Sequence, residues 1–293
     1  AQPTQTAGSS RFPGVLDLQG KLTRADATRV HRYLPLVLDA SVRHYVRDAV
    51  VQGSSGNVQF KVRGNLNDMP FTDPRKGEFR ITAALREGGL AYVPASLQAP
   101  AEAPWPALSQ LQGDLVFDRA SMQFKVSKGQ LGQLPLLRGE AQMADMQKAR
   151  LLVVQADARG PLAEMVRVVN SSPLDGWTGQ VLRQTSATGS ADLRLKLNLK
   201  LAALEKSTVQ GSVTLAGNDL QMTPTTPRLQ RVRGSVNFTD TGFTLAGVQA
   251  RLLGGDARLD GGTVPVAGGG ANAASATTRA VPDVVLRAQG MVT

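Results

Sequence analysis

Cysteine is absent from this 293-residue chain, and histidine occurs only twice, at His31 and His44. Without cysteine the chain has no disulfide framework, no thiol nucleophile, no cysteine-ligated zinc and no iron–sulfur cluster. Neither histidine has a second ligand at a metal-binding spacing, so we expect both to be ordinary solvated or helix-capping residues. The sequence therefore predicts neither a metal site nor a cofactor.

Aromatic residues are also scarce, with 2 Trp, 3 Tyr and 8 Phe making up 4% of the chain. No apolar run reaches the roughly 18 residues that a membrane-spanning helix needs. The sequence has neither the GxSxG turn of serine hydrolases nor the GxxxxGK[ST] loop that cradles phosphates. No pair of carboxylates is singled out as a catalytic acid and base. We expect a protein that is not an enzyme.

Positive charge is in excess, because 33 Lys and Arg against 23 Asp and Glu give a net charge of +10. These basic residues are dispersed, and the densest group, residues 228–233, has no aromatic side chains on which bases could stack. The polar half of an alternating strand accounts for Arg194, Lys196 and Lys200. We therefore expect no nucleic-acid partner.

The length alone suggests about two domains, but a recurring motif changes that expectation. The motif is an aliphatic residue, a polar residue, Gly, any residue and usually another aliphatic residue. It occupies residues 18–22, 62–66, 111–115, 209–213, 232–236 and 288–292, with weaker copies around Gly139, Gly160 and Gly189. Most spacings are near one or two units of ~25 residues, the size of a β-hairpin with its turns. The repeat predicts one elongated β-structure.

Two copies of the motif match beyond the glycine. Gly113, Phe117, Met122 and Phe124 recur 121 residues later as Gly234, Phe238, Phe243 and Leu245. Since the offset is the same at all four positions, we interpret the two segments as genuine repeats of one hairpin.

Strict alternation marks the strands. In residues 191–204, five leucines at every second position face one side and Arg194, Lys196, Asn198 and Lys200 face the other. This period of two is typical of a sheet with one dry and one wet face. A glycine at a similar place in each hairpin permits bulges and bends, so the sheet should curve strongly.

Helices are few and short. One helical pair is expected over residues 24–51, and a third helix follows Pro161. Residues 94–108 are expected to form a loop, residues 1–12 a flexible N-terminal stretch and residues 263–282 a flexible insertion. The predicted fold class is mainly β, an elongated, strongly curved antiparallel sheet over residues 13–293 with two or three short helices.

Three short helices cannot cover about twelve strands that each have an apolar face. Leaving the five leucines of residues 193–201 exposed would forfeit ~1.5–3 kcal/mol for each side chain. Either a second sheet covers this face, or the sheet curves around a ligand. On the second alternative, we expect the alternating apolar residues to line a groove. They are Phe60, Val62, Phe79, Ile81, Leu115, Phe117, Phe124, Leu193, Leu195, Leu197, Leu199, Leu201, Val213, Leu215, Val236, Phe238, Phe243 and Leu245.

Several segments carry a family resemblance. Residues 13–53 and 58–71, the loop around Trp105, and the motifs HRYLP, NDMPF, NSSPL and AGNDL together resemble the mid-region of large AsmA-like envelope proteins of the YhdP type, relatives of TamB. The similarity covers residues 13–262 and the C-terminal end, whereas the insertion 263–282 has no counterpart. Because the chain begins at Ala1 and ends within a strand pattern, we expect it to be a segment of a longer protein.

The resemblance implies a fold, a place and a role. Such proteins are anchored in the inner membrane of Gram-negative bacteria and extend through the periplasm, and their sheets curl into a long apolar groove. They are implicated in moving phospholipids towards the outer membrane. For this chain the resemblance implies phospholipid acyl chains as partners, together with the rest of the same long chain and an inner-membrane anchor outside this segment. It provides no catalytic residues.

Two other classes of function stay open at this point. The same repeat could be a structural scaffold that sets a distance in the envelope and carries no lipid. It could also be a polyanion-binding module, for which the affinity would fall steeply with salt. The residues themselves favour acyl chains, because an aliphatic surface with few aromatics suits chains of varied length.

Overall fold

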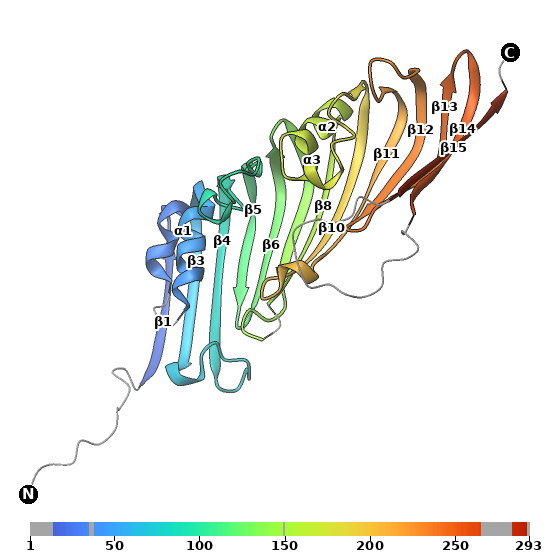
Figure 1. The fold of residues 1–293 in the computed structure, drawn as a ribbon. Coiled ribbons are helices and arrows are strands. Elements are labelled where there is room, and N and C mark those ends of the chain that lie inside the picture. Colours follow the sequence, from blue (N-terminus) through green and yellow to red (C-terminus); the bar gives the residue numbers. More distant parts are fainter. Residues whose placement is uncertain (1–13, 35–37, 149, 265–282, 292–293) are drawn as a thin grey trace, which may run out of the picture.

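The computed structural model describes residues 14–34, 38–148, 150–264 and 283–291 (Figure 1). The predicted flexible stretch 1–12 and nearly all of the predicted insertion 263–282 lie outside these residues. Everything described belongs to one long twisted sheet with short helical segments beside it.

The sheet has fifteen strands, all paired antiparallel, in the order β1-β3-β4-β5-β6-β7-β8-β10-β11-β12-β13-β14-β15, while β2 pairs with β3 and β9 with β11. The strands are β1 (Val15–Leu22), β2 (Ala25–Asp26), β3 (Val50–Asn65), β4 (Gly77–Leu90), β5 (Leu108–Asp118), β6 (Ser121–Leu131), β7 (Leu134–Met143), β8 (Leu151–Pro161), β9 (Ser186–Ala187), β10 (Ser190–Lys200), β11 (Thr208–Gln221), β12 (Leu229–Thr239), β13 (Phe243–Leu252), β14 (Gly255–Val264) and β15 (Asp283–Met291). The predicted mainly-β, antiparallel fold is confirmed. Among the described residues there is no second sheet.

The alternation in sequence becomes a separation of faces, because residues directly opposite each other in neighbouring strands point to the same side. One face carries the polar positions. Ion pairs cross its strands, for example Lys61–Glu78 at 2.7 Å, Arg80–Asp118 at 2.6 Å and Arg159–Asp192 at 3.5 Å. These pairs are partly exposed, so each contributes at most about 1 kcal/mol to stability. Their main effect is to keep charge on this face.

Glycines on the other face make room for phenylalanine rings. Gly211 lies directly opposite Phe238, whose ring crosses the space that a Cβ at residue 211 would occupy. At the start of the sheet, Phe71 folds back from the β3–β4 connection over the paired Gly64 and Gly77 and is fully buried. Motif glycines such as Gly64 and Gly211 thus leave space for a phenylalanine ring on this face, whereas Gly113 and Gly234 lie against the backbone of the neighbouring strand.

The repeat of 121 residues is present in the structure. Phe117 pairs with Met122 as Phe238 pairs with Phe243. Both hairpins also shift register at the same place, between residues 109 and 112 and between residues 230 and 233. The residue at each bulge has a positive φ, 51° at Gln110 and 53° at Arg231. Such bulges bend the strands and increase their twist.

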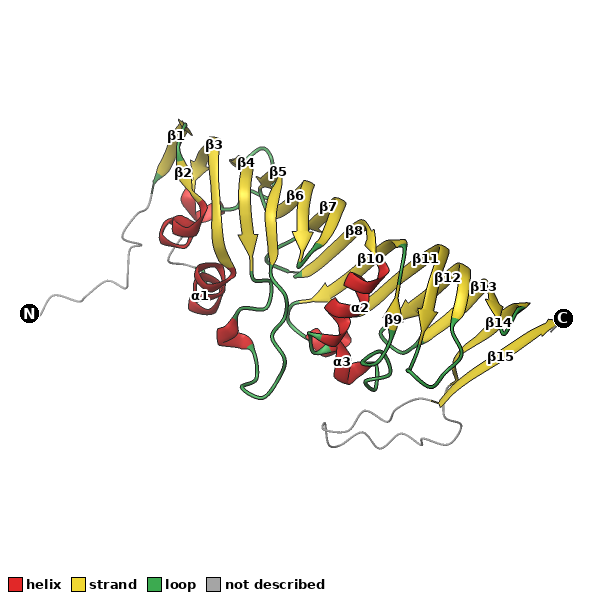
Figure 2. Ribbon diagram, turned by 90° about the horizontal axis from the view of Figure 1, so that it is seen from above, coloured by secondary structure: helices red, strands yellow, loops and turns green. Residues whose placement is uncertain are grey.

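The helical segments lie beyond the strand ends, and most of them gather at one end. That end has η1 (Ala27–Tyr33), α1 (Ala40–Ala49), η3 (Ala95–Leu97), α2 (Leu162–Asn170) and α3 (Leu174–Trp177), whereas η2 (Leu66–Asp68) and η4 (Leu204–Lys206) belong to connections at the opposite end. Figure 2 shows α1, α2 and α3 on the same side of the sheet. Leu162 and Met165 of α2 belong to a buried cluster with Ala158, Ala191 and Leu215. The helices therefore lie against the apolar face.

A chain of aromatic contacts, which we call the aromatic bridge, joins α1 to α3. Tyr45 of α1 donates a hydrogen bond from its hydroxyl to the carbonyl oxygen of Tyr92 at 3.0 Å. The rings of Tyr92 and Trp105 meet edge to face at 6.0 Å, and Trp105 meets Trp177 of α3 at 5.6 Å. Burial raises the pKa of Tyr92 to about 12. The bridge contains both tryptophans of the chain.

Asn218 provides a test of what holds β11 in place. Its side chain is 1% exposed and satisfies three backbone groups: Nδ2 donates to the carbonyl oxygens of Thr188 at 2.9 Å and Ser190 at 3.0 Å, and Oδ1 accepts from the N–H of Ala216 at 3.0 Å. Replacing Asn218 by Ala leaves these groups unpaired and should lower the free energy of unfolding by about 1–3 kcal/mol. Urea denaturation followed by circular dichroism measures the change. The exposed Asn237→Ala should stay within about 0.5 kcal/mol, and an equal loss in both variants would contradict the assignment.

The aromatic bridge is tested by Trp105→Ala. Edge-to-face pairs contribute about 0.5–1.5 kcal/mol each, and this change removes two of them. Hydrogen exchange of the amides in residues 92–106 and 174–178 should accelerate about 5- to 100-fold, while exchange in the central strands stays unchanged. The control is Leu97→Ala in the same loop, because Leu97 is 65% exposed. Unaltered exchange in the Trp105 variant would mean that the bridge does not hold the helices.

Candidate functional site

The apolar face of the sheet is the candidate site, and the strand register makes it continuous. One row of directly paired residues crosses nine strands, from β1 to β11. It runs through Leu22, Val58, Ala83, Leu115, Phe124, Ala141, Val154, Leu197 and Val209. With a strand spacing of about 4.8 Å, this row alone is about 38 Å long.

The register brings seventeen of the eighteen predicted lining residues to this one face. Val62 pairs with Phe79, and Phe60 pairs with Ile81, which pairs with Phe117. Leu193, Val213, Val236 and Leu245 form a second row, and Phe238 pairs with Phe243. Leu195, Leu197 and Leu199 follow Leu193 at every second position of β10, and Leu215 follows Val213 in β11. Leu115 and Phe124 lie in the first row.

Leu201 is the exception. The alternation predicts a strand that includes it, but β10 ends at Lys200, and Leu201 lies in the turn that leads to η4. Its N–H donates to the carbonyl oxygen of Arg150 at 3.0 Å, and its side chain is 45% exposed. The strand is shorter than the pattern because the chain must turn here to reach β11.

The sequence pattern missed the contribution of β7 and β8. Ala141, Val154 and Ala156 lie on the same face as the predicted residues. Their alternation is hidden because Leu151, Leu152, Val153 and Val154 are consecutive apolar residues. The register, in which Leu197 pairs with Val154, is the signal that finds them.

Charged side chains are absent from this face at the positions that strand pairing assigns to it in the described sheet. Three polar residues occur there, Ser55, Asn218 and Thr263, and each is hydrogen-bonded within the protein. Ser55 and Asn218 are also buried, at 7% and 1% exposure. The face therefore has no unsatisfied polar group that could select a particular ligand by hydrogen bonding.

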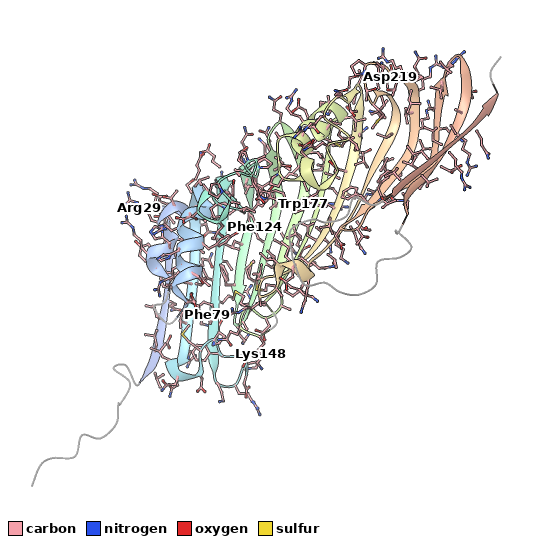
Figure 3. The ribbon with its side chains drawn as sticks, in the orientation of Figure 1. Arg29, Phe79, Phe124, Lys148, Trp177 and Asp219 are labelled. Atoms are coloured by element: carbon pink, nitrogen blue, oxygen red, sulfur yellow. The ribbon has the colours of Figure 1, made fainter. Side chains whose placement is uncertain are left out.

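Among the described residues, cover is confined to the margins of the face. Helix α2 packs on it at one end of the strands, over Ala158 and Ala191, and Phe71 covers the other end of β3 and β4. Between these margins the side chains of Phe79, Phe124 and Leu197 are half-buried. Figure 3 labels Phe79 and Phe124 on the sheet, with Trp177 of α3 nearer the helical end. The middle of the face is open.

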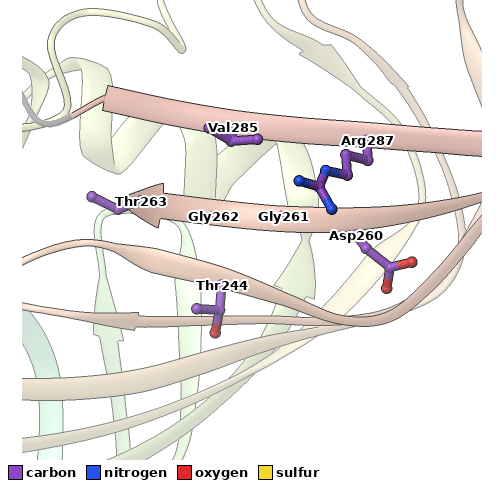
Figure 4. Close-up of a pocket in the computed structure, with 7 residues that line it drawn as sticks. All are labelled: Thr244, Asp260, Gly261, Gly262, Thr263, Val285 and Arg287. Carbon is purple, nitrogen blue, oxygen red and sulfur yellow. The ribbon is translucent and has the colours of Figure 1, made fainter. Parts of the chain in front are cut away.

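A separate pocket lies near the C-terminal strands (Figure 4). It has a volume of about 330 Å³ and is lined by Thr244, Asp260, Gly261, Gly262, Thr263, Val285 and Arg287. Asp260 and Arg287 are register partners of opposite charge, so the pocket has no clear preference for a charged ligand. In the described part of the chain, no group of three His, Asp or Glu residues is placed to hold a metal ion. No helix in that part is long and apolar enough to cross a bilayer.

Comparison with known proteins gives a consistent result. A sequence model of the family described as YhdP protein matches residues 2–289. The intermembrane phospholipid transporter YhdP of Escherichia coli (strain K12) is 26% identical over 238 residues, which cover 81% of this chain and 18% of that protein. This chain thus spans less than a fifth of the length of that relative. No solved structure matches. Since the family match covers nearly the whole chain, the chain belongs to the YhdP family.

Proposed function

We propose that this chain is a segment of a periplasmic bridge-like lipid-transfer protein, whose apolar face carries phospholipid acyl chains between the inner and outer membranes. The observation that supports this most directly is the continuous, uncharged and open apolar face across the sheet. The printed name of the E. coli relative, an intermembrane phospholipid transporter, points the same way.

The chemistry of the face limits its occupant. Each half-buried leucine or phenylalanine gains about 25 cal/mol for every Å² of apolar surface that a ligand removes from water. A charged or strongly polar ligand would lose its hydration without finding partners there. Because the face is long and has no fixed polar groups, it fits flexible hydrocarbon chains of varied length. It discriminates weakly between lipids by their acyl chains.

The proposal also includes the partners and the location. Further parts of the same long protein would continue the path on both sides, and a membrane anchor would lie outside this segment. The periplasm is the compartment in which such a path can connect two membranes. The chain itself acts by binding and guiding, and the proposal needs no catalytic group.

The scaffold alternative fits the structure less well. A spacer would be more stable and more soluble with its apolar face covered, since exposed apolar patches of this extent promote association. Here the helices cover only the margins, and charge is kept to the opposite face. These features favour a surface that a ligand covers.

Lipid extraction tests the function directly. The chain is produced in the periplasm of a Gram-negative host and purified without detergent, and its organic extract is analysed by mass spectrometry. Phospholipids should be present in at least equimolar amount. An extract free of phospholipid from folded protein would favour the scaffold.

A pair of neighbouring substitutions tests the assignment of the faces. Leu197 lies on the apolar face between Val154 and Val209, whereas Lys196 points to the polar face between Gln155 and Gln210. Leu197→Asp should reduce the phospholipid that co-purifies by about tenfold or more, because an ionised carboxylate in the acyl-chain path is costly to desolvate. Lys196→Asp should leave the amount of lipid unchanged. Circular dichroism establishes that both variants are folded, and equal lipid contents in the two variants would contradict the proposal.

A further inference from the structure

The two long edges of the apolar face differ. At one end of the strands lie α1, α2 and α3 and the aromatic bridge, all on the side of the apolar face (Figures 1 and 2). At the opposite ends, β7 is joined to β8 and β10 to β11 by short connections, of which the structure describes residues 144–148, residue 150 and residues 201–207. In Figure 3 Lys148 lies at this opposite end, away from Trp177. We call these two turns the open edge.

Three basic residues gather in the two turns of the open edge: Lys148, Arg150 and Lys206. All three are exposed. The two turns adjoin each other, because Lys200 is the register partner of Leu151 and the N–H of Leu201 donates to the carbonyl oxygen of Arg150 at 3.0 Å. Lys206 belongs to η4 in the second turn.

These positive charges are not neutralised by ion pairs. None of the three has a carboxylate oxygen within 4.0 Å among the described residues. The same turns contain two acidic residues, Asp145 and Glu205, and Oδ1 of Asp145 already accepts the N–H groups of Gln147 and Lys148, both at 2.8 Å.

The helical edge is different in this respect. There Arg47 pairs with Asp48 at 2.7 Å, Arg167 with Glu164 at 2.7 Å and Arg183 with Asp175 at 2.6 Å. The open edge therefore has an excess of positive charge that these helices lack.

Arg150 lies directly before β8, beside the edge of the apolar face. Arg150 is two residues before Leu152, which pairs with Leu199 on that face. Asp39, at the N-terminus of α1, lies on the same side of the sheet, and the pKa of its carboxyl group is lowered by hydrogen bonds from Ser41 and further by the charge of Arg150. Beside Arg150, Leu201 and Leu204 are 45% and 62% exposed. Positive charge and apolar surface thus meet at this edge.

We propose that Lys148, Arg150 and Lys206 form a phosphate-binding edge that holds the phosphodiester of a phospholipid whose acyl chains lie on the apolar face. This inference rests on the proposed function. A phosphodiester carries one negative charge, and charge-assisted hydrogen bonds from Arg and Lys are the strong kind. Since helices close the other edge, the headgroups emerge at the open edge and the lipids acquire one orientation across the sheet.

The test compares two charge reversals of equal size. The first variant, K148E/R150E/K206E, inverts the open edge. The matched control, K125E/R194E/K196E, inverts three exposed residues on the polar face, which also have no ion pair. Delipidated protein is titrated with fluorescent phosphatidylglycerol, with diacylglycerol bearing the same acyl chains, and with inorganic phosphate.

The wild-type chain should bind phosphatidylglycerol more tightly than diacylglycerol. The open-edge variant should lose at least tenfold in affinity for phosphatidylglycerol and stay within twofold for diacylglycerol, whereas the control variant should keep both affinities within about twofold. If the glutamate variant fails to fold, K148Q/R150Q/K206Q should show a three- to tenfold loss for phosphatidylglycerol alone.

Three results would overturn the inference. They are an unchanged affinity of the open-edge variants for phosphatidylglycerol, an equal loss in the control variant, and binding of inorganic phosphate as tight as that of phosphatidylglycerol, which would identify a free-phosphate site. A wild-type chain that binds neither diacylglycerol nor phosphatidylglycerol is a different outcome, because it contradicts the acyl-chain path itself.

Discussion

The separation of charged from apolar side chains at every second position is the constraint on which the rest of the structure depends. Because a strand has a period of two and the register is antiparallel throughout, a slip of one residue in any strand would place Arg and Lys among the leucines. The ion pairs on the polar face and the rings over glycines on the other face both favour the observed register. A continuous apolar surface follows from this register without any dedicated pocket.

A single-layer sheet of this length has consequences for stability. Each strand of the main path pairs only with its neighbours, as in repeat proteins, so most of the stabilising contacts are local. The buried cluster that includes Leu134, Met165, Leu215 and Val232 lies under and beside α2, at the end of the strands where the helices are. The open middle of the face has no such core. The buried core and the proposed lipid-binding surface are therefore different parts of the same strands.

The sequence predicts the faces well and the edges poorly. Alternation in residues such as Leu193–Lys200 identifies which side chains share a face, and the offset between Gly113 and Gly234 predicts a structural repeat. The structure extends this repeat to the bulges at Gln110 and Arg231. Where both faces are apolar, as at Leu151–Val154, the period is lost. The aromatic bridge and the open edge join residues that are far apart in the chain, so no local pattern could reveal them. Leu201 shows the limit of alternation at a strand end.

Photo-crosslinking along β10 tests the central claim most directly. A photoreactive amino acid is placed in turn at each position from residue 193 to residue 200, the chain is expressed in the periplasm, and lipid adducts are measured by mass spectrometry after irradiation. The account predicts adducts at positions 193, 195, 197 and 199 and little or none at 194, 196, 198 and 200. Adducts of equal yield at both sets of positions, or none at the odd ones, would contradict it.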